Sequence, residues 1–163
     1  AIPNLLTKRP ALLMVATIHA ATLLSRQMRD RLLAICHQMP ELHRRALILR
    51  VEDVPADILA SRAVELLAPL RALSRFRILV LGRADTMGLP LRDCGVSLVE
   101  VDCGVLIETA EREPARQEKL LADLRRQRAH LVVGHVDDRA AAAKAAALGA
   151  RFLSFDGPQA PAA

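Results

Sequence analysis

The sequence predicts an α/β fold in which strand–helix units follow one another and their strands form a parallel sheet. Short apolar runs alternate with longer amphipathic stretches along most of the 163 residues. The runs are nearly continuous in Val, Leu and Ile, as in parallel strands that are covered on both faces. The connections between them are short, which is typical of βαβ units. We therefore expect a single domain over residues 1–163, with about six strand–helix units.

Each expected strand is one of the apolar runs. The runs are Leu12–Ile18, Ala46–Val51, Arg77–Leu81, Ser97–Asp102, His130–Gly134 and Arg151–Phe155. Side chains near the centres of buried strands are expected to be almost fully buried. For this chain these are Val80, Leu81, Val99, Val101, Val132 and Val133.

The first two expected helices lie before and after the second strand. Arg26–Gln38 places Met28, Leu32, Ile35 and Met39 on one face, and Pro40 ends it. Ala56–Leu73 carries leucines at helical spacing, and Pro69 should kink or break this helix.

The second half of the chain has clear local signals for helix ends and loops. Pro114 suits the first turn of a helix that runs to about Gln127. Asp138 suits the cap of a helix that ends at Gly149. The segment Gly82–Gly95 contains several glycines and a proline, so we expect a loop with at most a short helix. The tail Gly157–Ala163 is rich in Pro and Ala and should be frayed.

The composition excludes several classes of protein. Hydrophobic residues make up 52% of the chain, yet no apolar run reaches the ~18 residues of a membrane span. No small-residue cleavage site follows the first apolar run, so a secretory signal is not expected. We expect a cytoplasmic protein without membrane insertion. Cys36, Cys94 and Cys103 are scattered without CxxC spacing, which argues against disulfide bonds and against a zinc site.

The net charge of +5 does not indicate a nucleic-acid partner. The arginines are spread over several helices, and the chain has no Trp or Tyr on which bases could stack. The glycines form neither G-x-G-x-x-G nor G-K-[ST], and G-x-S-x-G is absent. We therefore expect neither nucleic-acid binding nor a cofactor.

Five segments follow a common pattern in order along the chain. They are VATIHAATLLSRQMRDRLLA (residues 15–34), LILRVED (47–53), FRILVLGRAD (76–85), VSLVEVDCGVL (96–106) and HLVVGHVDDRAAAAKAAALGARFLSFDGP (130–158). Their order and spacing resemble the EAL domain, the β/α-barrel phosphodiesterase module of cyclic-di-GMP signalling. The second, third and fourth segments lie where that family has L-x-L-E-I-T-E, D-D-F-G and L-K-I-D, and the fifth matches V-V-A-E-G-V-E and the closing Q-G-Y strand. The resemblance implies an incomplete parallel β/α (TIM-like) barrel. It covers the last six of eight strand–helix units, about the C-terminal three quarters.

The resemblance also implies where the family's chemistry would lie. EAL enzymes hydrolyse a phosphodiester with a pair of divalent cations, which need oxygen ligands. The family's ligand Asn and Glu, paired Asp, catalytic Lys, later Glu and late Gln fall on Thr17, Arg50, Leu81, Gly82, Glu100, Gly134 and Ser154. None of these keeps the family's residue, and a cation at position 50 would repel a divalent ion. The Asp of L-K-I-D is retained as Asp102, for which capping of a turn is the alternative role.

These departures predict a domain that is not an enzyme and that binds no catalytic metal. The resemblance then implies a noncatalytic EAL-like regulatory domain that acts through protein–protein interaction in cyclic-di-GMP signalling. Its partner would be another protein domain or a second copy of the chain. We expect the contacts on the helix Pro114–Gln127 and the loop Gly82–Gly95, because the corresponding region of the family takes part in dimer contacts.

Two alternatives stay open. A noncatalytic cyclic-di-GMP receptor could use Arg50, Arg83 or Asp102 as ligand contacts. An active metal-dependent phosphodiesterase, or an enzyme with other chemistry, would need a new site near the carboxyl ends of the strands. The polar residues available for it are His19, Glu52, Asp85, His135 and Asp137. Polar residues at loop starts are the simpler interpretation of this set.

Overall fold

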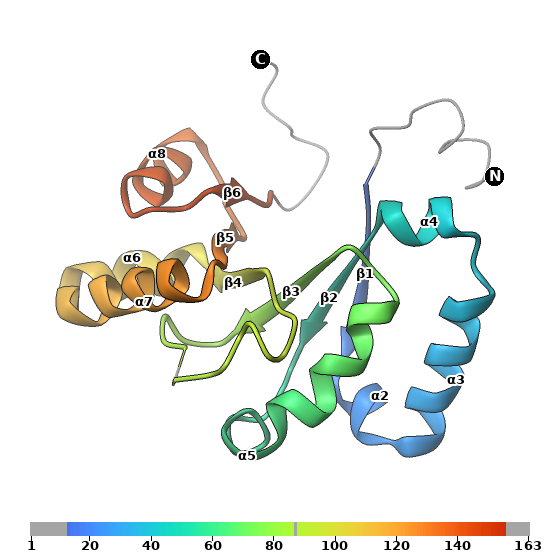
Figure 1. Ribbon diagram of the computed structural model, residues 1–163. Coiled ribbons are helices and arrows are strands. Elements are labelled where there is room, and N and C mark those ends of the chain that lie inside the picture. Colours follow the sequence, from blue (N-terminus) through green and yellow to red (C-terminus); the bar gives the residue numbers. More distant parts are fainter. Residues whose placement is uncertain (1–12, 87, 156–163) are drawn as a thin grey trace.

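A single six-stranded parallel sheet organises the computed structural model, which describes residues 13–86 and 88–155 (Figure 1). The strands are β1 (Met14–His19), β2 (Leu47–Glu52), β3 (Phe76–Leu81), β4 (Leu98–Asp102), β5 (His130–Gly134) and β6 (Phe152–Leu153). Each strand pairs in parallel with the next one along the chain. In the described part of the chain, β1 and β6 are the two edges and do not pair, so the barrel is not closed.

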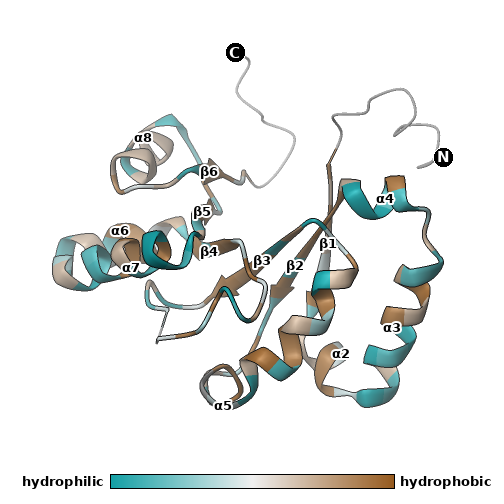
Figure 2. Ribbon diagram, in the orientation of Figure 1, coloured by the Kyte–Doolittle hydropathy of each residue, from teal (hydrophilic) through white to brown (hydrophobic). Residues whose placement is uncertain are grey.

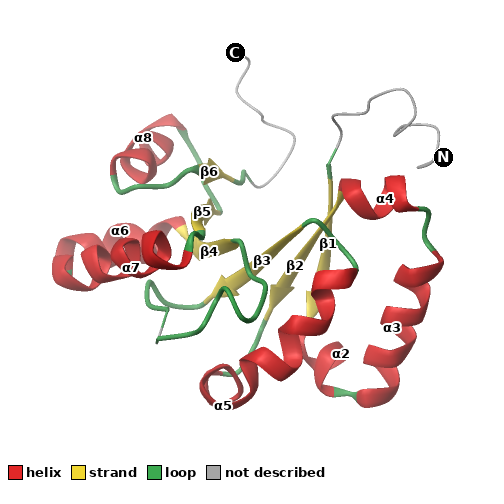
Figure 3. Ribbon diagram, in the orientation of Figure 1, coloured by secondary structure: helices red, strands yellow, loops and turns green. Residues whose placement is uncertain are grey.

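The helices surround the outer side of this curved sheet. They are α2 (Ala20–Leu24), α3 (Arg26–Gln38), α4 (Glu41–Ala46), α5 (Ala56–Leu67), α6 (Cys103–Arg112), α7 (Pro114–Gln127) and α8 (Arg139–Ala147), with a 3₁₀ helix at Ala68–Ala72. Figures 1 and 3 show them in an arc from α3 past α5 to α6, α7 and α8. The predicted α/β class and incomplete parallel barrel are therefore confirmed.

The hydrophobic core lies between the sheet and this outer layer of helices. Side chains at alternate strand positions point into it, among them Leu49, Leu79, Val99 and Val133, each at most 1% exposed. Figure 2 shows the strands as mostly hydrophobic and the helices as mixed, which fits helices with one buried face.

None of the described helices covers the inner face of the sheet. A hollow of about 760 Å³ on this face is lined by residues from all six strands, including Val15, Ile48, Ile78 and Val132. The expected full burial of Val80 is wrong, because Val80 is paired with Glu100 and lies on this open side, where it is partly exposed. The burial expected of the other positions is confirmed for Leu81, Val99, Val101, Val132 and Val133.

The strand bounds differ slightly from those expected. β6 has two residues instead of the run Arg151–Phe155, and β1 begins at Met14. Leu12 and the tail Gly157–Ala163, which we expected to be frayed, lie outside the described residues.

Local sequence signals set most helix ends. α3 has the expected bounds, and the expected break at Pro69 is the change from α5 to the 3₁₀ helix. The side chain of Asp138 accepts a 2.7 Å hydrogen bond from the backbone of Ala141 and caps α8. Among the described residues, no helix has both the length and the apolar character that a membrane span requires.

Two helical features differ from the expectation. The buried side of α3 is rotated from the predicted face. Leu32 and Met39 pack against the core as expected, but Met28 and Ile35 are 48% and 54% exposed and Cys36 is buried instead. Packing against the rest of the fold, with Leu32 and Leu33 partly buried, decided this rotation. The helices α2, α4 and α6 were not expected. For α6 a signal was present, because Asp102 before an amphipathic stretch is a typical cap.

Candidate functional site

The carboxyl ends of the six strands meet along one edge of the sheet, which is where barrel enzymes have their active sites. The strand register brings several of the sequence-derived positions together at this edge. Thr17 of β1 is paired with Arg50 of β2, and Asp102 of β4 is paired with Gly134 of β5. Leu81 does not join them, because its side chain is buried in the core against the helices.

A buried ion pair between Arg50 and Glu100 occupies the centre of this region. Arg50 donates from Nε to Oε2 of Glu100 at 2.9 Å and from Nη2 to Oε1 at 2.8 Å. Its third nitrogen, Nη1, donates to Glu52. Glu100 is only 5% exposed. The hydrogen bonds to Glu100 raise the pKa of the Arg50 guanidinium, although burial acts in the opposite direction. This two-pronged geometry is the strongest form of Arg–carboxylate pairing.

Gly134 makes room for the Glu100 carboxylate. A Cβ atom at position 134 would lie 2.6 Å from Oε1 of Glu100, closer than such atoms approach one another in proteins. A side chain at this position would require the Glu100 carboxylate to shift. The glycine thus allows the carboxylate to lie where Arg50 contacts it.

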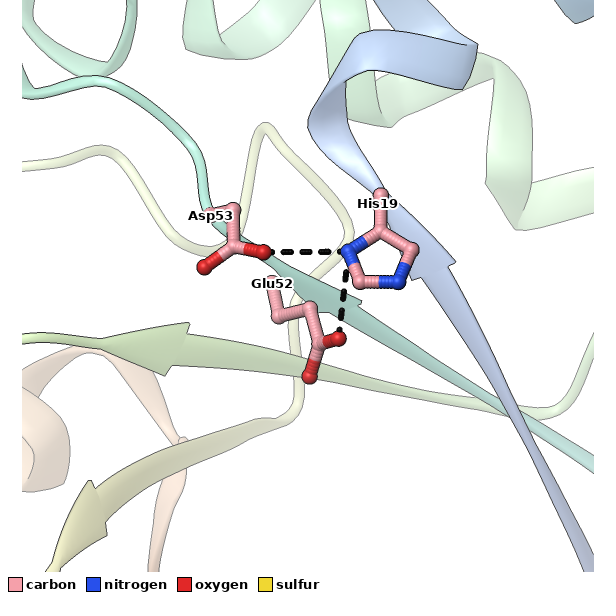
Figure 4. A group of neighbouring side chains, drawn as sticks. All are labelled: His19, Glu52 and Asp53. Carbon is pink, nitrogen blue, oxygen red and sulfur yellow. Dashed lines mark hydrogen bonds and ion pairs between the residues drawn. The ribbon is translucent and has the colours of Figure 1, made fainter.

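A second group, His19, Glu52 and Asp53, lies at the ends of β1 and β2 (Figure 4). Nδ1 of His19 is 3.0 Å from Oδ2 of Asp53 and 3.2 Å from Oε1 of Glu52. His19 lies opposite Glu52 in the register, and Asp53 adopts a positive φ of 57° directly after the strand. The ligand atoms lie within 4.8 Å of one another, a spacing at which a metal ion could be held.

The contacts of this group are already satisfied without an ion. Nδ1 of His19 lies within hydrogen-bonding distance of both carboxylates, and the other oxygen of Glu52 accepts from Arg50. Glu52 therefore joins the two groups into one chain of charges along the carboxyl edge.

Asp102 and His135 form a third pair at the ends of β4 and β5. Oδ1 of Asp102 accepts from the backbone of Val105 at 3.1 Å and caps α6, while Oδ2 lies 3.0 Å from Nδ1 of His135. The capping role considered for Asp102 is thus present, together with a contact to His135. Its side chain remains 43% exposed at this edge.

Two of the candidate residues lie in a different part of the molecule. Arg83 lines a hollow of about 260 Å³ beside α6 and α7. Asp85 lies 3.6 Å from Arg116 of α7. The polar residues considered for a new site therefore do not form one cluster. His19 contacts Glu52, His135 contacts Asp102, and Asp85 lies near Arg116 of α7.

The loop that contains Arg83 and Asp85 is fastened to α7. The hydroxyl of Thr86 donates to Asp123 at 2.9 Å, and Asp123 is a buried carboxylate. Nε2 of Gln127 donates to the carbonyl of Leu89 at 2.7 Å. No local sequence pattern indicated these long-range hydrogen bonds, which join the loop and α7 into one surface.

No protein-family model and no curated protein matches this chain. Solved EAL domains do resemble it in structure. The Bacillus subtilis YkuI protein, which has an EAL domain and is in complex with c-di-GMP and calcium, matches with a TM-score of 0.69, 14% identity and 94% of this chain. The phosphodiesterase PaMucR in its c-di-GMP complex matches with a TM-score of 0.65 and 16% identity over 93% of this chain. The Pseudomonas aeruginosa FimX EAL domain bound to c-di-GMP matches with a TM-score of 0.60 and 16% identity over 86% of this chain.

The comparisons establish the class of fold, which is that of the EAL-type β/α barrel. The chain spans 62%, 59% and 39% of the lengths of the PaMucR, FimX and YkuI chains. The resemblance is therefore a resemblance to part of each neighbour.

The residues present do not fit the divalent cations that the fold implies. The guanidinium of Arg50 lies where the resemblance expects a ligand carboxylate, and it is paired with Glu100. Of the first four positions that the resemblance assigns to metal ligands, Thr17 offers a hydroxyl group, whereas Leu81 and Gly82 offer no side-chain oxygen. Divalent cations of this kind need several oxygen ligands converging on one point.

Proposed function

We propose that this chain is a noncatalytic EAL-like regulatory domain that acts through protein–protein interaction in cyclic-di-GMP signalling in the cytoplasm. The observation that carries the proposal is the buried Arg50–Glu100 pair. It exchanges the charges that the resemblance assigns to a metal-ligand Glu and a catalytic Lys. Gly134 adds to the argument, because the family's Glu at that position would collide with Glu100.

Restoring the family's residue at one position should not restore phosphodiesterase activity. An Arg50→Glu variant would place a second carboxylate beside Glu100 and Glu52 and would still lack ligands at Leu81 and Gly82. Removal of one good transition-state contact commonly costs about 10²–10³ in rate, and here most of the metal ligands are replaced. The expected activity is therefore that of buffer alone.

Product formation from cyclic-di-GMP tests the noncatalytic part of the proposal. The full-length protein is incubated with Mg²⁺ or Mn²⁺ in excess, and linear dinucleotide is quantified by chromatography. We expect no turnover above buffer. Turnover that a chelator abolishes would overturn the proposal, and turnover kept in Arg50→Met would show that the reaction does not depend on this site.

The interaction surface that we propose is the one formed by α7 and the loop between β3 and β4. The hydrogen bonds from Thr86 and Gln127 hold the two together as one surface. Glu118 and Lys119 are exposed on α7. If the partner is a second copy, a charge-reversing double variant at these positions should weaken self-association in sedimentation velocity. The same double reversal at Asp30 and Arg31, which are exposed on α3, is the matched control, and an equal effect there would contradict this surface.

A cyclic-di-GMP receptor is the second candidate, since the three neighbours reported above are all described as bound to that dinucleotide. Arg50 could contact a phosphate only by giving up bonds to Glu100 or Glu52, whereas Arg83 is exposed. Calorimetric titration with and without Mg²⁺ separates the candidates. Saturable, metal-independent binding that Arg83→Gln weakens would favour the receptor.

A further inference from the structure

A hollow of about 290 Å³ lies at the amino ends of β2 and β3, on the opposite edge of the sheet from the site above. α4 and the segment after the 3₁₀ helix form its walls. Its charged lining residues are Arg44, Arg45, Arg71, Arg75 and Glu41, and we call it the arginine hollow. Four arginines against one glutamate leave a formal surplus of three positive charges.

Most of this charge has no carboxylate to pair with. Glu41 is engaged with Arg45 at 2.5 Å. Within the described residues, Arg44 and Arg71 have neither an ion-pair nor a hydrogen-bond partner, and Nε of Arg44 is buried without an acceptor. A buried N–H group without an acceptor lowers stability. An anion bound in the arginine hollow could balance the surplus positive charge.

Packing, rather than ion pairing, holds two of these arginines in position. The aliphatic part of Arg71 lies directly against Gly95, where a Cβ atom would overlap it. Gly95 also has a positive φ of 71°, so the close approach and the backbone both require glycine. The guanidinium of Arg75 lies 5.1 Å from the centre of the Phe76 ring. Side chains fixed in this way lose little freedom when a ligand binds.

A fifth arginine supports the base of the hollow. Arg77 donates from Nη1 to the carbonyl of Ser74 at 2.5 Å and from Nε to the carbonyl of Gly95. Burial and the nearby charge of Arg71 lower the pKa of Arg77. This repulsion between like charges would be relieved by an anion at the hollow.

We propose that the arginine hollow binds a phosphate group, either inorganic or carried by a small molecule. Guanidinium groups donate pairs of parallel hydrogen bonds to phosphate oxygens, which suits a site built from arginines. A phosphate or diphosphate carries enough negative charge to match the surplus, and its small size suits the hollow. The inference is independent of the function proposed above, because the two sites lie at opposite edges of the sheet.

Titration of the ¹⁵N-labelled full-length protein with pyrophosphate, inorganic phosphate and glycerol phosphate tests the proposal at constant ionic strength. We expect saturable shifts in the NMR signals of Leu73, Ser74 and the arginine side chains. A higher affinity for pyrophosphate than for glycerol phosphate would indicate a free anion, and the reverse order a phosphorylated small molecule.

Single substitutions separate a built site from the general positive charge of the protein. Arg71→Gln should weaken binding at least tenfold. Arg75→Gln, which removes a lining charge and a surface cation–π contact, should also weaken it. Arg139→Gln removes the same charge from an exposed position on α8 and should change nothing. Shifts that never saturate, or an equal loss in Arg139→Gln, would overturn the proposal. So would unchanged binding in both Arg71→Gln and Arg75→Gln.

Discussion

Replacing Arg50 by Met should strongly destabilise the protein, because it leaves Glu100 charged and buried. The side chain of Glu100 is 6% exposed, and Arg50 supplies two hydrogen bonds to it. Breaking a buried pair by removing one partner typically costs about 3–5 kcal/mol, whereas replacing both partners by apolar residues is often neutral or stabilising. The Arg50→Met/Glu100→Leu double variant should therefore be within about 1 kcal/mol of the parent protein, or more stable.

Urea unfolding monitored by circular dichroism gives the free energies of the parent, both single variants and the double variant. Glu100→Leu alone should cost less than Arg50→Met, because Arg50 keeps its contact with Glu52. The difference between the double variant and the sum of the singles is the coupling energy of the pair.

A matched control is available on the surface of α5. Arg62 donates to Glu65 through Nε and Nη2 at 3.0 and 2.7 Å, with the same two-pronged geometry but with both side chains exposed. Exposed pairs contribute little, so Arg62→Met should change stability far less than Arg50→Met. Equal costs at the two arginines, or a double variant as unstable as Arg50→Met, would refute the reasoning.

Three further predictions concern the sheet and its surroundings. Leu81→Ala should cost ~2–5 kcal/mol in urea unfolding, because Leu81 is 4% exposed in the core, and a loss near zero would mean that the strand is misplaced. Gly134→Ala should destabilise the parent but do so less in a Glu100→Leu background, since the added Cβ meets the Glu100 carboxylate; equal losses in both backgrounds would contradict this. Burial raises the pKa of Cys94 from 9.0 to about 11. The unfolded thiol ionises first, so stability should fall as the pH rises from about 9 to about 11, and Cys94→Ala should flatten that decline. An unchanged pH dependence in this variant would disprove the effect.

Much of the fold could be predicted from the sequence, because the signals for it are local. The apolar runs located all six strands, and Pro69, Pro114 and Asp138 set their helix boundaries through the geometry and capping needs of a few neighbouring residues. The orientation of α3, in contrast, is not set by a local signal. Leu32 and Met39 of the predicted face do pack against the core, whereas Met28 and Ile35 are as apolar and stay exposed. Only packing against the rest of the fold turned the buried side toward Leu33 and Cys36.

The candidate site, too, has features that the sequence determines and features that only the tertiary structure decides. The sequence by itself determined which side chains occupy the positions that the resemblance assigns to metal binding, and hence that Arg50, Leu81 and Gly82 offer no side-chain oxygen atom. From the sequence, Arg50 and Glu100 are two separate departures from the family's residues, although they carry opposite charges. Only the tertiary structure decided that they form one buried pair, with the carboxylate lying over Gly134. These residues are far apart in sequence, and the strand register and the curvature of the sheet, rather than any local pattern, bring them into contact.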